Sequence, residues 1–321
     1  MFTLKEKILL ALKGFGMGSA NVVPGVSGGT IALLTGIYSR LIDAIDALSV
    51  PANYKLLFSG KIKDFIKKID GAFLLWLTIG LLASVFSLAK LMEYLIIYHP
   101  VQTWAFFFGL IIASAIYMLA EIKNWTFKDA LIVLVGIALG VAVCTLSPTK
   151  TPDNLWFVFL SGAIAICAMI LPGISGSFLL VILGKYEFIM RSIYTFDIPV
   201  LLAFGLGCVT GIVAFAKFLH WLLGKWERAT LLTLIGFVFG SLIKVWPWND
   251  MEAVTKATLL GQGMTVEQAE AGLQAFLEAG VKLNSVADMH MNAAIVWALA
   301  GLLVVWLLET LSKKISSSHA A

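Results

Sequence analysis

The sequence predicts an all-α, polytopic membrane protein made of two inverted repeats, each with a re-entrant helical hairpin followed by transmembrane helices. Three observations predict this fold class: the composition, the length of the apolar runs and two related glycine-rich breaks. Of the 321 residues, 60% are hydrophobic and 13% are charged, and the mean hydropathy is +0.94. Soluble domains average about 25% charged residues. The composition therefore excludes a water-soluble enzyme, a nucleic-acid-binding protein and a disordered chain.

Apolar runs of membrane-spanning length account for much of the chain. A spanning helix needs about 20 apolar residues, and several runs meet or approach that length. Tryptophans lie mostly near the ends of these runs, as they do in the aromatic belts of membrane proteins. From the apolar runs and the rest of the chain, we expect about seven full spans. The predicted spans are 73–97, 103–119, 127–146, 200–223, 230–246 and 292–308.

Two further apolar stretches, 8–47 and 155–194, are interrupted in the middle. The pattern Pro-Gly-(Val/Ile)-Ser-Gly stands at residues 24–28 in the first stretch and at 172–176 in the second. Half-length helices around a glycine-rich break are typical of a chain that turns back within the membrane. Both stretches are therefore predicted to form re-entrant hairpins.

The two halves of the chain resemble each other. The breaks and the Gly-x-Tyr that follows each of them recur in one register, the hairpin register, in which Gly25 matches Gly173. An Ala-Lys pair ending at Lys90 matches one ending at Lys217 in a second, shorter register, the span register. This self-similarity indicates an internal duplication, with repeat 1 over 1–150 and repeat 2 over 151–321. Three spans separate the hairpins, and this odd number places them on opposite sides of the membrane, so the repeats are predicted to be inverted.

Lysine and arginine are unevenly divided between the two sides of this topology. One side receives fifteen and the other six. The excess marks the cytoplasmic side, so both termini are predicted to be cytoplasmic in a bacterial inner membrane. The polar segment 249–291 then lies outside. In it, Thr265 and Gln268 form a predicted capping box, and Gly280 is expected to end the helix that follows.

The hairpin tips carry the predicted chemistry. A broken helix exposes backbone N–H groups where the helix dipole is positive. Glycines let a ligand approach closely, serines add donors, and two such tips facing each other suit an anion such as phosphate. The alternative is that small residues merely let kinked helices pack closely. The predicted phosphate-binding residues are Gly25, Ser27, Gly28, Gly29 and Thr30 in the first hairpin and Gly173, Ser175, Gly176 and Ser177 in the second.

Five ionisable residues are predicted charge partners of the bound anion. Lys90 and Lys217 lie within apolar runs, where a lipid-facing ammonium costs about 2.5–3.5 kcal/mol. Pointing inward, they would attract phosphate from either side; in the alternative, each extends to its nearer interface. Arg40 and Arg191 follow the hairpins and would meet an incoming phosphate or act as interfacial anchors. Glu187 is a candidate proton carrier.

The sequence predicts no metal site and no cofactor. The three cysteines lie inside apolar runs and form no CxxC motif, which indicates buried thiols rather than disulfides. The four histidines form no HExxH motif and have no metal-ligand spacing to the cysteines.

Both motifs resemble the signatures of PopT, a family of polyprenyl-phosphate transporters. The first motif is Gly-Ser-Ala-Asn-Val-Val-Pro-Gly-Val-Ser-Gly-Gly-Thr at 18–30 with Gly-Ile-Tyr at 36–38. The second is Leu-Pro-Gly-Ile-Ser-Gly-Ser at 171–177 with Gly-Lys-Tyr-Glu at 184–187. The resemblance covers essentially the whole chain. This chain has Asn21 where many members carry an acidic residue.

The resemblance implies a lipid flippase rather than an enzyme. Its substrate would be undecaprenyl phosphate, the lipid carrier for peptidoglycan and other envelope polymers, which is returned to the cytoplasmic leaflet for recycling. The implied partners are this polyprenyl phosphate and the membrane lipids, with no nucleic acid. Coupling of transport to protons or ions and assembly into a homo-oligomer are both compatible with the resemblance.

Two other functions remain as alternatives. Undecaprenyl-pyrophosphate phosphatases also use inverted repeats with re-entrant hairpins, but their signature Pro-Gly-x-Ser-Arg-Ser supplies an arginine that stabilises phosphoryl charge. Gly28 and Gly176 stand at the corresponding positions here, and the first hairpin has no carboxylate before Asp43. A small-anion channel is the second alternative, because the same helix ends would suit it.

Overall fold

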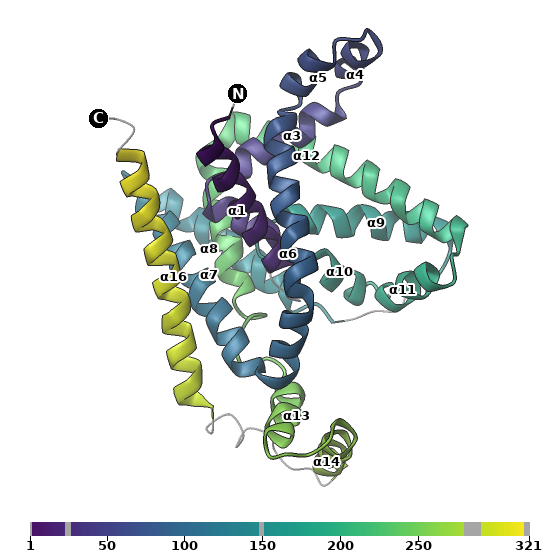
Figure 1. Ribbon diagram of the computed structural model, residues 1–321, viewed down its shortest axis with the longest axis vertical. Coiled ribbons are helices and arrows are strands. Elements are labelled where there is room, and N and C mark those ends of the chain that lie inside the picture. The colour runs from purple at the N-terminus through teal and green to yellow at the C-terminus, as the bar shows by residue number, and fades with distance from the viewer. Residues whose placement is uncertain (1, 23–26, 148–150, 279–289, 318–321) are drawn as a thin grey trace. The chain divides into compact units, whose positions relative to one another are not determined.

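The computed structural model describes residues 2–22, 27–147, 151–278 and 290–317. Every regular element in these ranges is a helix (Figure 1). Four helices among the described residues are long and apolar enough to cross a membrane. These findings confirm the predicted all-α, polytopic class. The four are the segment Gly71–Leu88 of α6 (Gly71–Tyr98), α7 (Pro100–Glu121), α8 (Phe127–Cys144) and α12 (Ile198–Ser241).

Helix α12 contains the span predicted at 200–223 and most of the one predicted at 230–246. Its 44 residues run through a break at Trp226, whose φ of −139° and ψ of 50° are not helical. The helix ends at Ser241, before the predicted end at residue 246. Pro247 excludes a helix that continues through residue 246, because proline disfavours helical backbone in the residue before it and cannot donate a helix hydrogen bond.

The chain forms two compact units. Unit 1 consists of Met1–Leu88 and Trp125–Ser241, and unit 2 consists of Ala89–Asn124 and Leu242–Ala321. Each unit therefore contains helices from both predicted repeats.

Two hairpins of the same construction lie in unit 1. In each, a long helix is followed by the break, a seven-residue helix of about 10 Å, a glycine turn and a third helix. The turn glycines Gly36 and Gly184 have φ of 68° and 63°, the left-handed region that favours glycine. Both short helices pack back against the long helix that precedes them. The helices are α1 (Leu4–Val22), α2 (Gly28–Leu34) and α3 (Tyr38–Ser49), and α9 (Leu155–Ile170), α10 (Gly176–Ile182) and α11 (Tyr186–Tyr194).

Each long hairpin helix is packed closely against a predicted span. A Cβ atom on Gly80 of α6 would lie 1.8 Å from the carbonyl oxygen of Ala11 in α1. Likewise, a Cβ atom on Gly207 of α12 would lie 2.0 Å from the carbonyl oxygen of Phe159 in α9. Only glycine permits this backbone contact, so the two helix pairs depend on these positions.

The rest of unit 1 comprises α8 and two short helices. Helix α8 packs on the second part of α12 through glycines on both sides, since a Cβ on Gly136 would lie 2.3 Å from the oxygen of Thr233. Close glycine contacts of this kind are typical of helix pairs in membranes. The short helices are α4 (Pro51–Phe58) and α5 (Ile62–Lys68), and α5 has no buried residue.

Unit 2 contains α7, α13 (Met251–Gly261), α14 (Val266–Glu278) and α16 (Met291–Ser317). Figure 1 shows α16 beside α7, and these helices are the main contact of the unit. The predicted capping box is confirmed: Thr265 Oγ1 accepts from Gln268 N at 3.3 Å, and Gln268 Oε1 accepts from Thr265 N at 2.9 Å. Gly280, the predicted end of this helix, lies outside the described residues.

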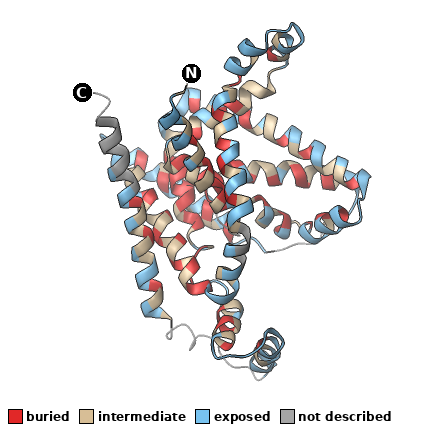
Figure 2. Ribbon diagram, in the orientation of Figure 1, coloured by how far each residue is buried: buried red, intermediate tan, exposed pale blue. Residues whose placement is uncertain are grey.

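Large apolar side chains face outward along the long helices. Phe86 of α6 is 84% exposed, and Val209 of α12 is 60% exposed. Figure 2 shows exposed and half-buried positions along the outer faces of these helices. Such surfaces are unusual for a soluble protein and are expected where helices contact lipid.

Candidate functional site at the two helix breaks

The two breaks lie against each other within unit 1. Ser27 Oγ donates to the carbonyl oxygen of Leu171 at 3.0 Å. Gly173 N donates to Thr30 Oγ1 at 2.7 Å. Gly29 is close enough to the second break that a Cβ atom would lie 2.5 Å from the oxygen of Ile170. Residues from the two halves of the sequence therefore form one site.

At the first break, the start of helix α2 is capped. Ser27 Oγ accepts from Gly29 N at 3.1 Å, and Asn21 Oδ1 accepts from Gly28 N at 2.8 Å. Ser27 and Thr30 are 2% and 1% exposed, so both hydroxyls are enclosed and bonded within the protein. Gly25, which was predicted to contribute here, lies outside the described residues.

At the second break, the start of helix α10 is left without a side-chain cap. Ser175 occupies the N-cap position but accepts no hydrogen bond from the helix backbone. Its hydroxyl instead lies 2.7 Å from Ser177 Oγ, and Ser177 is exposed. First-turn N–H groups without an acceptor are the donors that bind anions at helix N-termini. The Ser175 hydroxyl at the second break therefore does not cap its helix, whereas the Ser27 hydroxyl at the first break does.

Two glycines shape the second break. Gly173 has a φ of 87°, and a Cβ atom there would also lie 2.7 Å from Ser241 Oγ. A Cβ atom on Gly176 would lie 2.6 Å from the oxygen of Ala165 in α9. The conformation and the close contact both require glycine, so these residues fix the position of Ser175.

Arg40, one of the predicted charge partners, is bound to another protein group. Its Nε donates to Asp70 Oδ2 at 2.6 Å and its Nη2 donates to Asp70 Oδ1 at 3.1 Å. The guanidinium also lies 4.5 Å from the ring centroid of Phe73. This bidentate pair ties α3 to the start of α6.

The other predicted charge partners form no ion pair among the described residues. Glu187 and Arg191 are exposed on α11, and Lys217 is exposed on α12 beside the fully buried Ala216. Lys90 lies in α6, but its side chain is outside what the structure describes. In the described ranges, no three His, Cys, Asp or Glu side chains lie close enough together to hold a metal ion.

Comparison with known proteins identifies the family. A family model described as undecaprenyl phosphate translocase-like matches residues 17–262, a stretch that contains both breaks. The chain belongs to this translocase-like family. It is 42% identical to a polyprenyl-phosphate transporter of Vibrio cholerae over 239 residues, which cover 74% of this chain and 77% of the relative. It is 36% identical to a polyprenyl-phosphate transporter of Staphylococcus aureus over 255 residues, 74% of this chain and 85% of the relative. No solved structure matches it.

In this translocase-like chain, sequence reasoning missed a fully buried lysine in the second hairpin. Lys185 is 0% exposed. Its Nζ donates to the oxygen of Thr151 at 2.7 Å and forms an ion pair with Asp153. Thr151 in turn donates to the carbonyl oxygen of Leu183 at the end of α10. Lys185 thus ties the end of the short helix to the segment before α9.

The first hairpin fastens its short helix in a related way. Lys13 Nζ donates to the oxygen of Thr35, the C-cap residue of α2, at 2.7 Å. A lysine near a helix C-terminus is a known way to bind the last carbonyl groups. The sequence signal was therefore present in both hairpins, but sequence spacing alone could not pair each lysine with its carbonyl.

Proposed function

We propose that this chain transports undecaprenyl phosphate across the bacterial cytoplasmic membrane, returning the carrier for another round of envelope synthesis, including peptidoglycan. The observation that carries the proposal is the contact between two Pro-Gly-x-Ser-Gly breaks inside an apolar helical unit, with one helix start left uncapped. Its relatives, named polyprenyl-phosphate transporters, support the substrate class.

The phosphate group binds at the second break in this proposal. Ser175 and Ser177 supply hydroxyls, and the first turn of α10 at Gly176 supplies backbone donors. Hydrogen bonds to a charged group are stronger than those between neutral groups, and the positive end of a helix favours an anion. The first break supports this geometry, because Thr30 holds the backbone N–H of Gly173.

We further propose that the chain is an inverted duplication that works by alternating access. Helix bounds support the duplication: α2 and α10 begin in the hairpin register, and so do α3 and α11. Helices α6 and α12 begin in the span register. In that same register His99, just before α7, corresponds to Trp226, and its φ of −135° and ψ of 50° nearly match the −139° and 50° of that break.

The proposed topology places both termini in the cytoplasm and α14 outside. It is tested with single cysteines in a chain whose native cysteines are replaced by serine. The exposed Gln274 on α14 and Ser59 between α4 and α5 are suitable positions. In intact spheroplasts, an impermeant thiol reagent is expected to label Q274C and not S59C. The reverse pattern would contradict the orientation.

The function is tested by lipid binding to the purified chain. We expect wild-type protein to bind undecaprenyl phosphate and Ser175→Leu to bind it at least about tenfold more weakly, because one to two hydrogen bonds to a charged group are lost. The variant should reach the membrane at wild-type levels, since Ser175 is only half-buried.

Equal binding by Ser175→Leu and wild type would mean that the break is a packing device. A second arm addresses the enzyme alternative with undecaprenyl pyrophosphate. Release of inorganic phosphate above a vector control would overturn the transporter assignment.

A further inference from the structure

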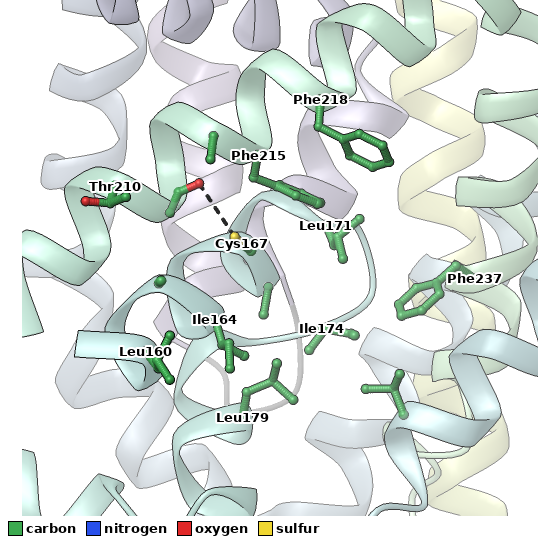
Figure 3. A pocket seen from close by; sticks show the side chains of 15 residues that line it. Leu160, Ile164, Cys167, Leu171, Ile174, Leu179, Thr210, Phe215, Phe218 and Phe237 are labelled. Carbon is green, nitrogen blue, oxygen red and sulfur yellow. Dashed lines mark hydrogen bonds between the residues drawn. The ribbon is translucent and has the colours of Figure 1, made fainter. Parts of the chain in front are cut away.

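An apolar cavity opens beside the second break of unit 1. Its volume is about 610 Å³, within the range of roughly 300–1,000 Å³ that is usual for small-molecule sites. Helices α9 and α12 form most of its wall, and α8, α10 and the break between α9 and α10 contribute the rest. Figure 3 shows side chains that line this space, with a dashed line for the hydrogen bond from Cys167 to the oxygen of Gly211.

The cavity adjoins the break that carries the proposed phosphate site. Leu171 and Ile174, which flank the Pro-Gly pair of the break, both line it. Ile174 directly precedes Ser175, and Leu179 lines the cavity one turn into α10. Residues on either side of Ser175 in the sequence therefore belong to the wall of the apolar volume, close to where an anionic group is proposed to bind.

The lining suits a branched hydrocarbon and not a second polar group. Its two polar side-chain atoms are already bonded: Thr210 Oγ1 donates to the oxygen of Leu206 at 2.8 Å, and Cys167 Sγ donates to the oxygen of Gly211 at 3.6 Å. Small residues such as Gly211 and Ala214 give the cavity depth, and Phe215 faces it. Methyl branches fit between small side chains, and flat double bonds gain dispersion contacts against aromatic rings.

The matching positions of the first half carry hydroxyls instead. Cys167 corresponds to Ser19 in the hairpin register, and Gly211 corresponds to Ser84 in the span register. Those two serines are hydrogen-bonded to each other at 2.8 Å. Position 214 likewise corresponds to a serine, at position 87. The apolar lining therefore belongs to the second half, the same half whose break is uncapped.

We infer that this cavity binds the isoprene units nearest the phosphate of the polyprenyl phosphate, while the phosphate binds at Ser175 and Ser177. The inference rests on the proposed function and adds a site for the lipid tail. The distal part of the tail remains in the bilayer. The cavity thus distinguishes an isoprenoid chain from the straight acyl chains of phospholipids.

Two native cysteines provide a matched test without any substitution. Cys167 and Cys208 are both half-buried, and their thiols donate across the same pair of helices, to the oxygens of Gly211 and Gly162. Only Cys167 of the two lines the cavity. A ligand in the cavity should therefore protect Cys167 from a small thiol reagent and leave Cys208 reactive.

The measurement is the rate of N-ethylmaleimide modification at each cysteine, followed by mass spectrometry on the full-length protein in detergent. With undecaprenyl phosphate or farnesyl phosphate at ten times its dissociation constant, modification of Cys167 should slow about tenfold while that of Cys208 is unchanged. Dodecyl phosphate has the same phosphate group and a straight chain. At the same concentration as farnesyl phosphate, it should protect Cys167 less. Equal protection by dodecyl phosphate would contradict an isoprenoid site.

A pair of variants tests the same inference through affinity. Ala214→Trp, at an exposed position of α12, fills the cavity, whereas Val209→Trp adds the same side chain at an exposed position outside it. Ala214→Trp should weaken undecaprenyl phosphate binding about tenfold, because burial of two or so methylene-sized groups is lost, and Val209→Trp should not.

The two proposals fail in different ways. If wild-type protein binds undecaprenyl phosphate but Cys167 stays fully reactive and Ala214→Trp binds normally, the tail site is wrong and the transporter proposal stands. If wild-type protein does not bind the lipid phosphate at all, the proposed function fails and the tail site fails with it.

Discussion

The first hairpin, α1 to α3, has a tip whose polar groups are paired within the protein, whereas the tip of the second, α9 to α11, leaves a helix start uncapped. Ser27 caps α2 and bonds to Leu171, while its counterpart Ser175 caps nothing and faces Ser177. The same five-residue motif thus gives two local structures. The difference teaches that a repeated motif need not give a repeated structure: Ser27 of one copy is bonded within the protein, and the other copy is the one that we propose to bind the phosphate.

The frames of the two hairpins, in contrast, are nearly the same. Gly80 lies against Ala11 in the first pair of helices, and Gly207 lies against Phe159 in the second. These contacts correspond in the hairpin and span registers, so the packing of the long helices is shared. The predictions below separate the shared frame from the unequal tips.

The largest effect is expected at the shared frame. Gly80→Val and Gly207→Val would place a Cβ atom within 2.0 Å of a carbonyl oxygen, so each helix pair must separate at a cost of about 3 kcal/mol or more. This loss of stability is measured by the folded yield and the thermal unfolding of the purified variants. Gly205→Val, where nothing lies within 4 Å, is the control. A severe loss of stability in one of these two variants and none in the other would contradict a packing shared by the two hairpins.

The next effect distinguishes the two tips. Ser27→Ala removes a helix cap and the bond to Leu171, so stability should fall by about 1–2 kcal/mol. Ser175→Ala removes neither and should change stability by less than about 0.5 kcal/mol. Its effect should be on undecaprenyl phosphate binding, which we expect to weaken about tenfold. Thermal unfolding and lipid binding of both variants, measured side by side, would contradict the account if their effects were exchanged.

The smallest effect concerns a difference between the hairpins at one matched position. Lys185 corresponds to Ile37, and both side chains are buried. Lys185→Ile should therefore give a folded protein of near wild-type stability, because an apolar side chain replaces a fully buried ammonium group. Asp153→Ala should cost about 1 kcal/mol, since it leaves the ammonium without its counter-ion while Asp153 itself is largely exposed. Thermal unfolding measures the stability of the two variants. A greater loss of stability in Lys185→Ile than in Asp153→Ala would contradict this prediction.

Local patterns in the sequence predicted the features that depend on local residues. Apolar length predicted the long helices, Pro-Gly pairs predicted the breaks, and Thr265 with Gln268 predicted the start of α14. A helix start or a break is determined by a few neighbouring residues, so it can be recognised in one sequence.

Partners distant in the sequence were beyond such patterns. The bond between Ser27 and Leu171 joins two halves of the chain, and Arg40, a predicted anion partner, pairs with Asp70 thirty residues away. The burial of Lys185 likewise depends on residues 151–153, which precede a different helix. These features follow from tertiary packing, which hydrophobic periodicity does not encode.

The most direct test of the central claim is reconstitution of the purified chain in liposomes with labelled undecaprenyl phosphate in the inner leaflet. We predict that wild-type protein brings the labelled lipid to the outer leaflet, where an impermeant reagent detects it, and that Ser175→Leu does so far more slowly. Movement no faster than in protein-free liposomes, with protein shown to be folded and inserted, would contradict the claim.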